Sequence, residues 1–141
     1  MILLFRDALV KGIKQIYEND RNEVHRKGAK FVKEYFSFLE YQLVEEIEVS
    51  NGEVSFRIEE GYPYSMELND KKLIFDMDSE SKFVVSVNHL DQDNFLEEID
   101  TLIPNGIDFI SENFEGKKLD NELMDIYLER AFKKEMLELL N

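Results

Sequence analysis

The sequence contains no cysteine, so it has no thiolate nucleophile and no thiolate metal ligand. Its candidate acid–base and metal-binding side chains are the carboxylates and two histidines. Asp76, Asp78 and Glu80 alternate along the chain, which is how the ligands of an EF-hand calcium loop begin. Such a loop also needs glycine where Ser81 stands and a bidentate acid where Val87 stands. We therefore interpret the three acids as the solvated tip of a β-hairpin and predict no metal site.

A second acidic group, Asp91, Asp93, Glu97 and Glu98, follows shortly afterwards. Paired carboxylates can hydrolyse glycosides, but a chain with 31 Asp and Glu offers many pairs, so pairing by itself indicates no reaction. Acids near the start of a helix interact favourably with its positive end, which explains this group as a capped, exposed helix face. We predict no catalytic residue and no cofactor site from it.

The two histidines, His25 and His89, have no triad or metal-binding partners at recognisable spacings. The sequence also contains no glycine-rich phosphate loop, dinucleotide fingerprint or serine elbow. We therefore expect a protein that is not an enzyme. A small enzyme with an unrecognised acidic site is an alternative, and it would need a pocket that holds a strongly perturbed carboxylate or histidine.

Charge is distributed unevenly along the chain, whose formal net charge is −14. Residues 1–36 carry eight basic and five acidic side chains, whereas residues 37–130 carry seven basic and 24 acidic ones. A negative field repels nucleic acid and anionic membranes and attracts cationic surfaces. We therefore expect a basic protein partner and neither direct nucleic-acid binding nor membrane binding. Alternatively, the basic N-terminal helices of one subunit could bind the acidic side of a sister subunit and form a homodimer.

Small acidic domains without catalytic motifs have the general profile of immunity proteins, antitoxins and phage inhibitors of host defence, although no family motif is present. We therefore expect a non-enzymatic protein-binding module that inhibits a basic partner. An export chaperone that binds an unfolded client as a dimer is another alternative, and it would need a large exposed apolar patch. The residues predicted to bind the partner are the acids of both groups and two aromatic anchors: Asp76, Asp78, Glu80, Asp91, Asp93, Glu97, Glu98, Tyr62 and Tyr64.

The elements that must position these residues begin with helical periodicity, which predicts one bent helix or two consecutive helices over residues 3–43. The aromatic residues at 35–41 are more numerous than the buried face of a single helix requires. We therefore expect some of them to touch a second subunit or a second helix. The apolar residues that recur at steps of three and four near the N-terminus are Ile2, Phe5, Leu9, Ile13 and Ile16.

From residue 45 the apolar period changes to two, which predicts five antiparallel strands at 45–50, 53–60, 64–69, 71–78 and 82–88. The Asn51-Gly52 pair predicts a two-residue hairpin loop between the first two strands. The expected cross-strand pairs are Val49 with Val54, Ile47 with Phe56, Met66 with Leu73, Tyr64 with Phe75, Glu67 with Lys72, Met77 with Phe83 and Phe75 with Val85.

The C-terminal third returns to helical spacing. We expect a short helix over 95–103, an edge strand or a helical turn over 107–114, and a last helix capped by Asp120. The expected fold is one α+β domain over residues 1–141, with an N-terminal helix or helix pair, a five-stranded antiparallel β-meander and C-terminal helices packed on one sheet face. Arg6 and Asp7 interrupt the first apolar run, so we predict no signal peptide or membrane span and a cytoplasmic location.

Overall fold

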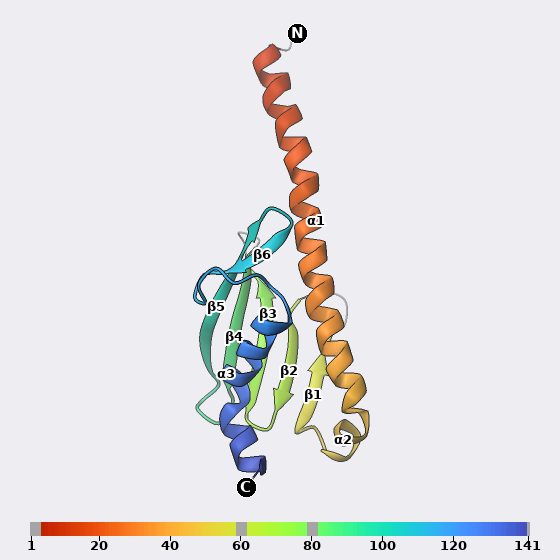
Figure 1. Cartoon of the computed structure of the whole chain (residues 1–141), viewed down its shortest axis with the longest axis vertical. Helices are drawn as coiled ribbons and strands as arrows, with labels where there is room; N and C mark the ends of the chain where they lie inside the picture. Colours follow the sequence, from red (N-terminus) through yellow and green to blue (C-terminus); the bar gives the residue numbers. More distant parts are fainter. Residues whose placement is uncertain (1–3, 59–61, 79–81, 141) are drawn as a thin grey trace.

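The computed structural model describes residues 4–58, 62–78 and 82–140, which form two long helices, one short helix and an antiparallel sheet (Figure 1). Helices α1 (Phe5–Gln42) and α2 (Val44–Val49) precede the sheet, and α3 (Asn121–Leu140) follows it. The six strands pair in chain order as a meander: β1 (Val54–Arg57), β2 (Tyr64–Leu68), β3 (Lys71–Met77), β4 (Phe83–His89), β5 (Phe95–Asn105) and β6 (Asp108–Ser111). The α+β class is therefore confirmed, with six strands where five were expected.

The central strands confirm the predicted register. Between β2 and β3, Met66 faces Leu73 and Glu67 faces Lys72, as the turn at Asn69 with its positive φ of 55° requires. The remaining pairs expected for β2 to β4 are also present: Tyr64 with Phe75, Phe75 with Val85, and Met77 with Phe83. The predicted turn and strand-end residues at 59–61 and 79–81, Glu80 among them, lie outside the described residues.

The predicted first strand is wrong, because residues 44–49 form α2 and the first strand β1 pairs with β2. Asn51 and Gly52 do adopt positive φ angles of 54° and 90°, but they connect a helix to a strand. The Ser50 hydroxyl closes this connection by donating to the Ile47 carbonyl and accepting from the Val54 amide. Positive φ permits any tight reversal of the chain, and glutamate favours a helix, so the turn residues did not by themselves determine a hairpin.

The helix predicted over 95–103 is also wrong, since this segment belongs to strand β5. The pairing with β4 shifts where Val85 faces Asp100 and Ser86 faces Glu98, which leaves Ile99 in a β-bulge. The apolar residues of this segment have helical spacing in the sequence, but on the strand Phe95 and Leu96 are exposed while Ile99 and Leu102 are buried. Pairing with β4 therefore decided the structure where the local spacing did not. The strand alternative for 107–114 is confirmed by β6, and one C-terminal helix, not several, covers the sheet.

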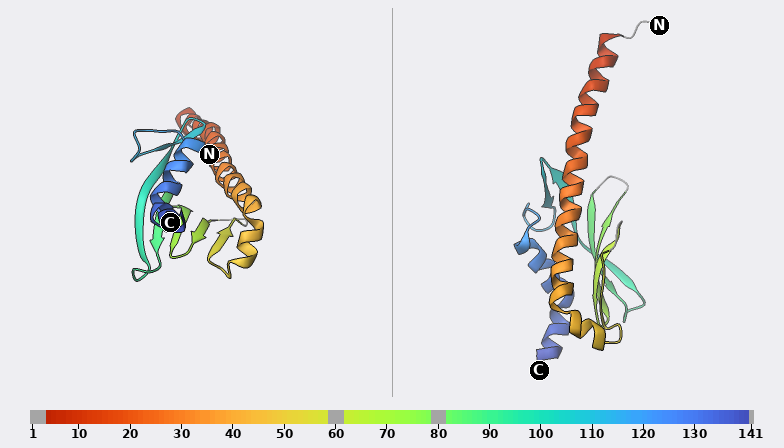
Figure 2. Two further views of the ribbon diagram at one scale, coloured as in Figure 1. Left: turned by 60° about the horizontal axis from the view of Figure 1, so that its bottom comes forward. Right: turned by 90° about the vertical axis from the view of Figure 1, so that its right-hand side faces the viewer.

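The two long helices pack on the same face of the sheet (Figure 2), and both contact Phe75 of β3. The Phe75 ring contacts Phe36 of α1 and Tyr127 of α3 edge-on, at centroid distances of 5.7 and 5.6 Å. All three side chains are fully buried. The N-terminal segment is one unbroken helix of 38 residues, which settles the choice between one helix and two.

Helix α1 approaches the end of the sheet closely at Gly28. A Cβ atom at this position would lie 2.6 Å from the Phe109 ring of β6, which itself packs edge-on against Phe83 at a centroid distance of 4.8 Å. Phe109 is 2% exposed, so its ring has little room to move. The missing side chain of Gly28 therefore sets how closely α1 lies on β6.

A buried carboxylate joins the last two strands, β5 and β6, to α3. Asp100 is 1% exposed, and its Oδ1 accepts hydrogen bonds from the amides of Thr101 and Asn113 at 2.8 and 3.0 Å. Its Oδ2 accepts from the hydroxyls of Ser111, at 2.5 Å, and Tyr127. Burial and the hydrogen bond to Asp100 raise the pKa of Tyr127, so this phenol remains a donor. Asp120 accepts from the Leu123 amide at 3.0 Å, which confirms the predicted cap of α3.

Gly28→Ala should lower the free energy of unfolding by about 1–2 kcal/mol, because overpacking against Phe109 outweighs the better helix propensity of alanine. The matched control is Gly12→Ala on the same helix, where a Cβ atom meets nothing within 4 Å and stability should not fall. Urea unfolding followed by circular dichroism measures both variants. Equal stability of the two variants would contradict the close approach at Gly28.

Tyr127→Phe should destabilise the fold by about 1–3 kcal/mol, because it removes one of the donors that satisfy the buried Asp100 carboxylate. Tyr41→Phe serves as the control, since Tyr41 is 80% exposed and its loss of a hydroxyl should change stability by less than about 0.5 kcal/mol. The measurement is again urea unfolding. A loss in Tyr127→Phe no larger than in the control would show that Asp100 does not depend on this donor.

Candidate functional site

The two acidic groups predicted to bind a partner lie at opposite ends of the sheet (Figure 1). Asp76 and Asp78 lie where β3 leads into the β3–β4 connection, whereas Asp91, Asp93, Glu97 and Glu98 surround the β4–β5 connection. The fold therefore does not bring them together into one acidic surface. Their role in binding stays a prediction, and each group has to be considered separately.

The acids at the β3–β4 end take part in local hydrogen bonds. The Asp78 carboxylate accepts from the Lys82 amide at 2.9 Å, and the Asp78 amide donates to the Lys82 carbonyl, so the two residues close the hairpin. Asp76 is exposed and accepts from the Met77 amide at 2.9 Å. The predicted hairpin tip is thus consistent with the structure on both sides of the residues that are not described.

The acids at the β4–β5 end include two with basic partners. Asp91 pairs with Lys71 at 2.8 Å, and Glu97 contacts the Nε2 atom of His89 at 3.0 Å. Asp93 lies in the turn with a φ of 57°, and Glu98 is exposed on β5. The local partners reduce the field that Asp91 and Glu97 present to solvent, so this group is a weaker cation-binding surface than its sequence indicates.

The two predicted aromatic anchors differ in exposure. Tyr64 is 6% exposed and belongs to the core, while Tyr62 is half-buried and packs edge-on against Tyr64 and Phe83 at centroid distances of 5.0 and 5.4 Å. Burial, with a smaller contribution from Tyr64, raises the pKa of Tyr62 to about 12. Of the two rings, Tyr62 therefore has the more surface to offer a partner.

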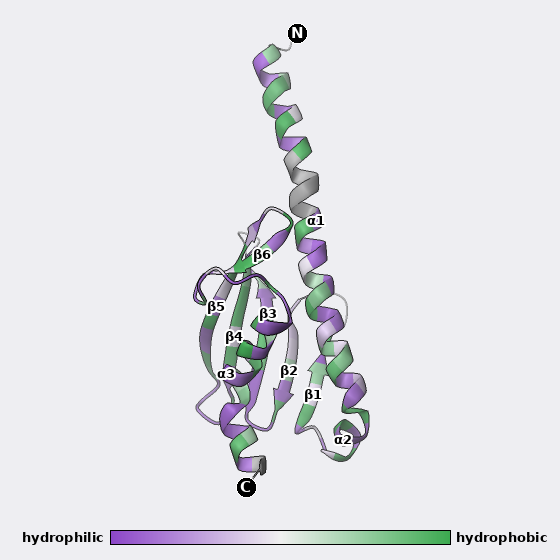
Figure 3. Ribbon diagram, in the orientation of Figure 1, coloured by the Kyte–Doolittle hydropathy of each residue, from purple (hydrophilic) through white to green (hydrophobic). Residues whose placement is uncertain are grey.

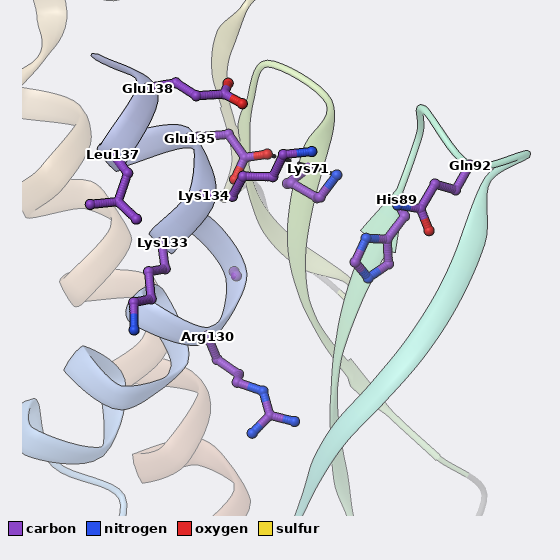
Figure 4. Close-up of a pocket in the computed structure, with 10 residues that line it drawn as sticks. Lys71, His89, Gln92, Arg130, Lys133, Lys134, Glu135, Leu137 and Glu138 are labelled. Carbon is purple, nitrogen blue, oxygen red and sulfur yellow. Dashed lines mark ion pairs between the residues drawn. The ribbon is translucent and has the colours of Figure 1, made fainter. Parts of the chain in front are cut away.

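A cleft of about 520 Å³ lies between α3 and the ends of β3 and β4 (Figure 4). Glu135 and Lys134 of α3 lie beside Lys71 of β3, and His89 of β4 stands across the opening. The Lys71 side chain is 7% exposed and lies 2.8 Å from Asp91 and 3.7 Å from Glu135. Burial by itself lowers the pKa of Lys71, but its hydrogen bond to Asp91 and the nearby acids outweigh burial and raise it. The cleft therefore contains an ion network of both signs that ties α3 to the sheet.

A second and more apolar depression runs between α1 and α3, and we call it the α1–α3 groove. One part, of about 730 Å³, has aromatic side chains of α1 on one wall and the first turns of α3 on the other. The next part, of about 410 Å³, continues along α3 and has two side chains of β2 as its floor. Asp125 lines both parts, so they adjoin along α3, and we treat them together as one groove. Its apolar lining consists of Phe31, Tyr35, Phe38, Leu39, Met66, Leu68, Leu128, Phe132, Met136 and Leu137.

The rim of the α1–α3 groove is acidic. Glu34 of α1 and Glu122, Asp125 and Glu129 of α3 line it, with Lys133 at one end. Glu34 and Glu122 pair with Lys30 and Lys117, whereas Asp125 and Glu129 have no ion-pair partner within the described part of the chain. Burial, and then the charge of Asp125, raise the pKa of Tyr35 in the wall. The groove therefore combines an apolar lining with uncompensated negative charge.

The two walls of this groove differ in how far the sequence indicated them. The aromatic residues at 35–41 were expected to touch a second subunit or helix. Tyr35 and Phe38 among them line the groove, and a contact with a second subunit stays a prediction. The acids of α3 were not singled out. Glu122, Asp125 and Glu129 recur at steps of three and four, which places them along one helix face and is the signal that could have found them.

Comparisons with known proteins give no assignment. No protein-family model matches this chain, and neither a curated protein nor a solved structure matches it. The residues that the structure describes contain no group of three or more His, Asp or Glu side chains placed to hold a metal ion. None of the described helices is long and apolar enough to span a bilayer.

The pair formed by Asp91 and Lys71 should make stability depend on pH. The hydrogen bond from Lys71 lowers the pKa of Asp91 in the folded state, although burial opposes it. The stabilisation is therefore present above about pH 4, the ordinary range of an aspartate, and is lost as the pH falls through the lower folded-state pKa. Asp91→Asn should lower the melting temperature at neutral pH, and its difference from the parent chain should shrink on acidification.

Glu98→Gln is the control for this measurement, because Glu98 is exposed and has no ion pair within the described ranges. Melting curves at a series of pH values, recorded by circular dichroism, compare the three proteins. A difference between Asp91→Asn and the parent chain that stays constant down to strongly acidic pH would show that the ion pair does not stabilise the fold.

Proposed function

We propose that this protein is a non-enzymatic protein-binding module that holds a cationic amphipathic helix of its partner in the α1–α3 groove. The observation that supports this most directly is the combination, in one groove, of exposed aromatic and aliphatic side chains with the acids Asp125 and Glu129. A helix with an apolar face and flanking Lys or Arg side chains fits such a groove, because it can bury its apolar residues while its charges stay at the rim.

The net charge of the molecule supports the same partner chemistry. A formal charge of −14 attracts cationic proteins over distances comparable to the Debye length and raises their association rate at low salt. The negative electrostatic field of the whole molecule would attract the partner to its surface. The groove would then select a helix that has an apolar face flanked by Lys or Arg. Affinity then comes mainly from the buried apolar contacts and specificity from the acidic rim.

Inhibition of a basic partner, of the immunity, antitoxin or anti-defence type, is the particular form of this function that the sequence favoured. The groove supplies the docking element that such an inhibitor would need. The export chaperone is the alternative, and it differs in one testable respect: a chaperone binds extended, unfolded segments, whereas an amphipathic groove selects a folded helix.

A fluorescent peptide of leucine and lysine that forms an amphipathic helix should bind the protein, as measured by fluorescence anisotropy. Asp125→Lys combined with Glu129→Lys should weaken binding at low salt by about tenfold, because both rim charges change from attraction to repulsion. The control is Asp76→Lys combined with Glu98→Lys, which changes the net charge equally but lies outside the groove. The control should weaken binding much less.

Equal loss in the two double variants would assign binding to the general acidic surface and contradict the groove. A second peptide of the same composition, but with prolines that prevent a helix, separates the two functions. Preference for the helical peptide supports the groove, whereas equal binding of both peptides would favour the chaperone. No binding of either peptide would overturn the proposal.

A further inference from the structure

The N-terminal part of α1 extends past β6 and away from the rest of the molecule (Figures 1 and 2). We call residues 4–16 the projecting segment. Of the α1 side chains that the structure describes, Val24 is the first that is buried. Nothing else in the described chain therefore covers the projecting segment.

The projecting segment has an apolar stripe along one face. Phe5, Leu9, Ile13 and Ile16 recur at steps of four, four and three, and they are 81%, 50%, 46% and 63% exposed. In Figure 3, hydrophobic and hydrophilic colours alternate along the part of α1 that stands clear of the sheet. Contiguous exposed apolar side chains bordered by charged residues mark an interaction surface. The stripe is therefore a surface to which a partner could bind.

The chemistry of the projecting segment matches that of the α1–α3 groove. Arg6 and Lys14 lie one turn before and one turn after Val10, which is 47% exposed at the edge of the stripe. With Lys11 they give the segment three basic side chains against one acid, Asp7. The segment is thus a cationic amphipathic helix, which is the ligand that the acid-rimmed apolar groove would bind.

The segment cannot enter the groove of its own chain. Phe31, Tyr35 and Phe38 form a wall of that groove and belong to the same unbroken helix as the segment. At about 1.5 Å per residue, a rigid helix separates Ile13 from Tyr35 by roughly 33 Å, and it keeps the two apart. Any docking between these two surfaces has to occur between molecules.

We propose that the projecting segment of one molecule occupies the α1–α3 groove of a second copy, and that two such contacts, related by a two-fold axis, close a homodimer. The proposal rests on the proposed function, because it takes the groove to be the binding site for a cationic amphipathic helix. Each chain carries both complementary surfaces, so a reciprocal arrangement satisfies both grooves and both segments at once. A foreign cationic helix would then compete with the segment of the sister subunit.

The first experiment measures the mass in solution by size-exclusion chromatography with light scattering. The parent chain should have twice the mass of the 16.7 kDa chain. Ile13→Asp should be a monomer or dissociate at least tenfold more readily, because the charge falls in the apolar stripe. Gln15→Asp adds the same charge to the same exposed stretch of helix but outside the stripe, and it should remain a dimer.

The second experiment distinguishes docking in the groove from packing of one segment against the other. Phe38→Asp changes an exposed residue of the groove wall, and this variant should also be a monomer. A mixture of Ile13→Asp and Phe38→Asp should form a heterodimer, because one intact segment meets one intact groove. Native mass spectrometry detects it. A Phe38→Asp chain that remains a dimer, or a mixture that stays monomeric, would overturn the proposed contact.

The remaining outcomes separate this proposal from the proposed function. A monomeric parent chain that binds anionic lipid vesicles through Ile13 would assign the stripe to a membrane surface and overturn the dimer. A monomeric parent chain that still binds the leucine–lysine peptide would overturn the dimer while supporting the groove. Ile13→Asp, whose groove would be vacant, should bind that peptide at least as tightly as the parent chain. Failure of this variant to bind would contradict the proposed function itself.

Discussion

The Asp100 carboxylate accepts hydrogen bonds from two backbone amides and from the hydroxyls of Ser111 and Tyr127. A carboxylate with 1% exposure is tolerated in a protein interior only when its oxygens have such partners. The bulge at Ile99 turns Asp100 toward the face of the sheet on which α3 lies. Asp100 therefore links strand β5 and the segment after β6 to helix α3. It fixes the position of α3 together with the packing of Tyr127 on Phe75 and the ion pair of Lys71 with Glu135.

The position of α3 in turn creates the α1–α3 groove. Each long helix contacts Phe75 from its own side, and the groove is the space that remains between the two helices above the sheet. The aromatic wall comes from α1 and most of the acidic rim from α3, while Met66 and Leu68 of β2 form the floor. An apolar surface with an acidic border thus results from two helices that were each amphipathic before they packed.

The central strands could be predicted from the sequence because their turns are short and their apolar residues alternate. The pairs Met66 with Leu73 and Phe75 with Val85 depend on periods and turns within a few residues of each other. The errors occurred where a local signal has two meanings. Asn51 and Gly52 supply positive φ to a helix–strand connection as readily as to a hairpin. The apolar residues of β5 have helical spacing in the sequence although the segment pairs with β4 as a strand.

The sequence by itself determined the α+β class, the register of β2 to β4 and the cap of α3. It also determined that residues 1–36 are net basic and residues 37–130 net acidic. These properties depend on the order of neighbouring residues. Only the tertiary structure decided which acids share a surface with which apolar side chains, because Tyr35 and Asp125 meet through the packing of two helices on Phe75. It also left the stripe from Phe5 to Ile16 exposed, since the sheet ends before the helix does.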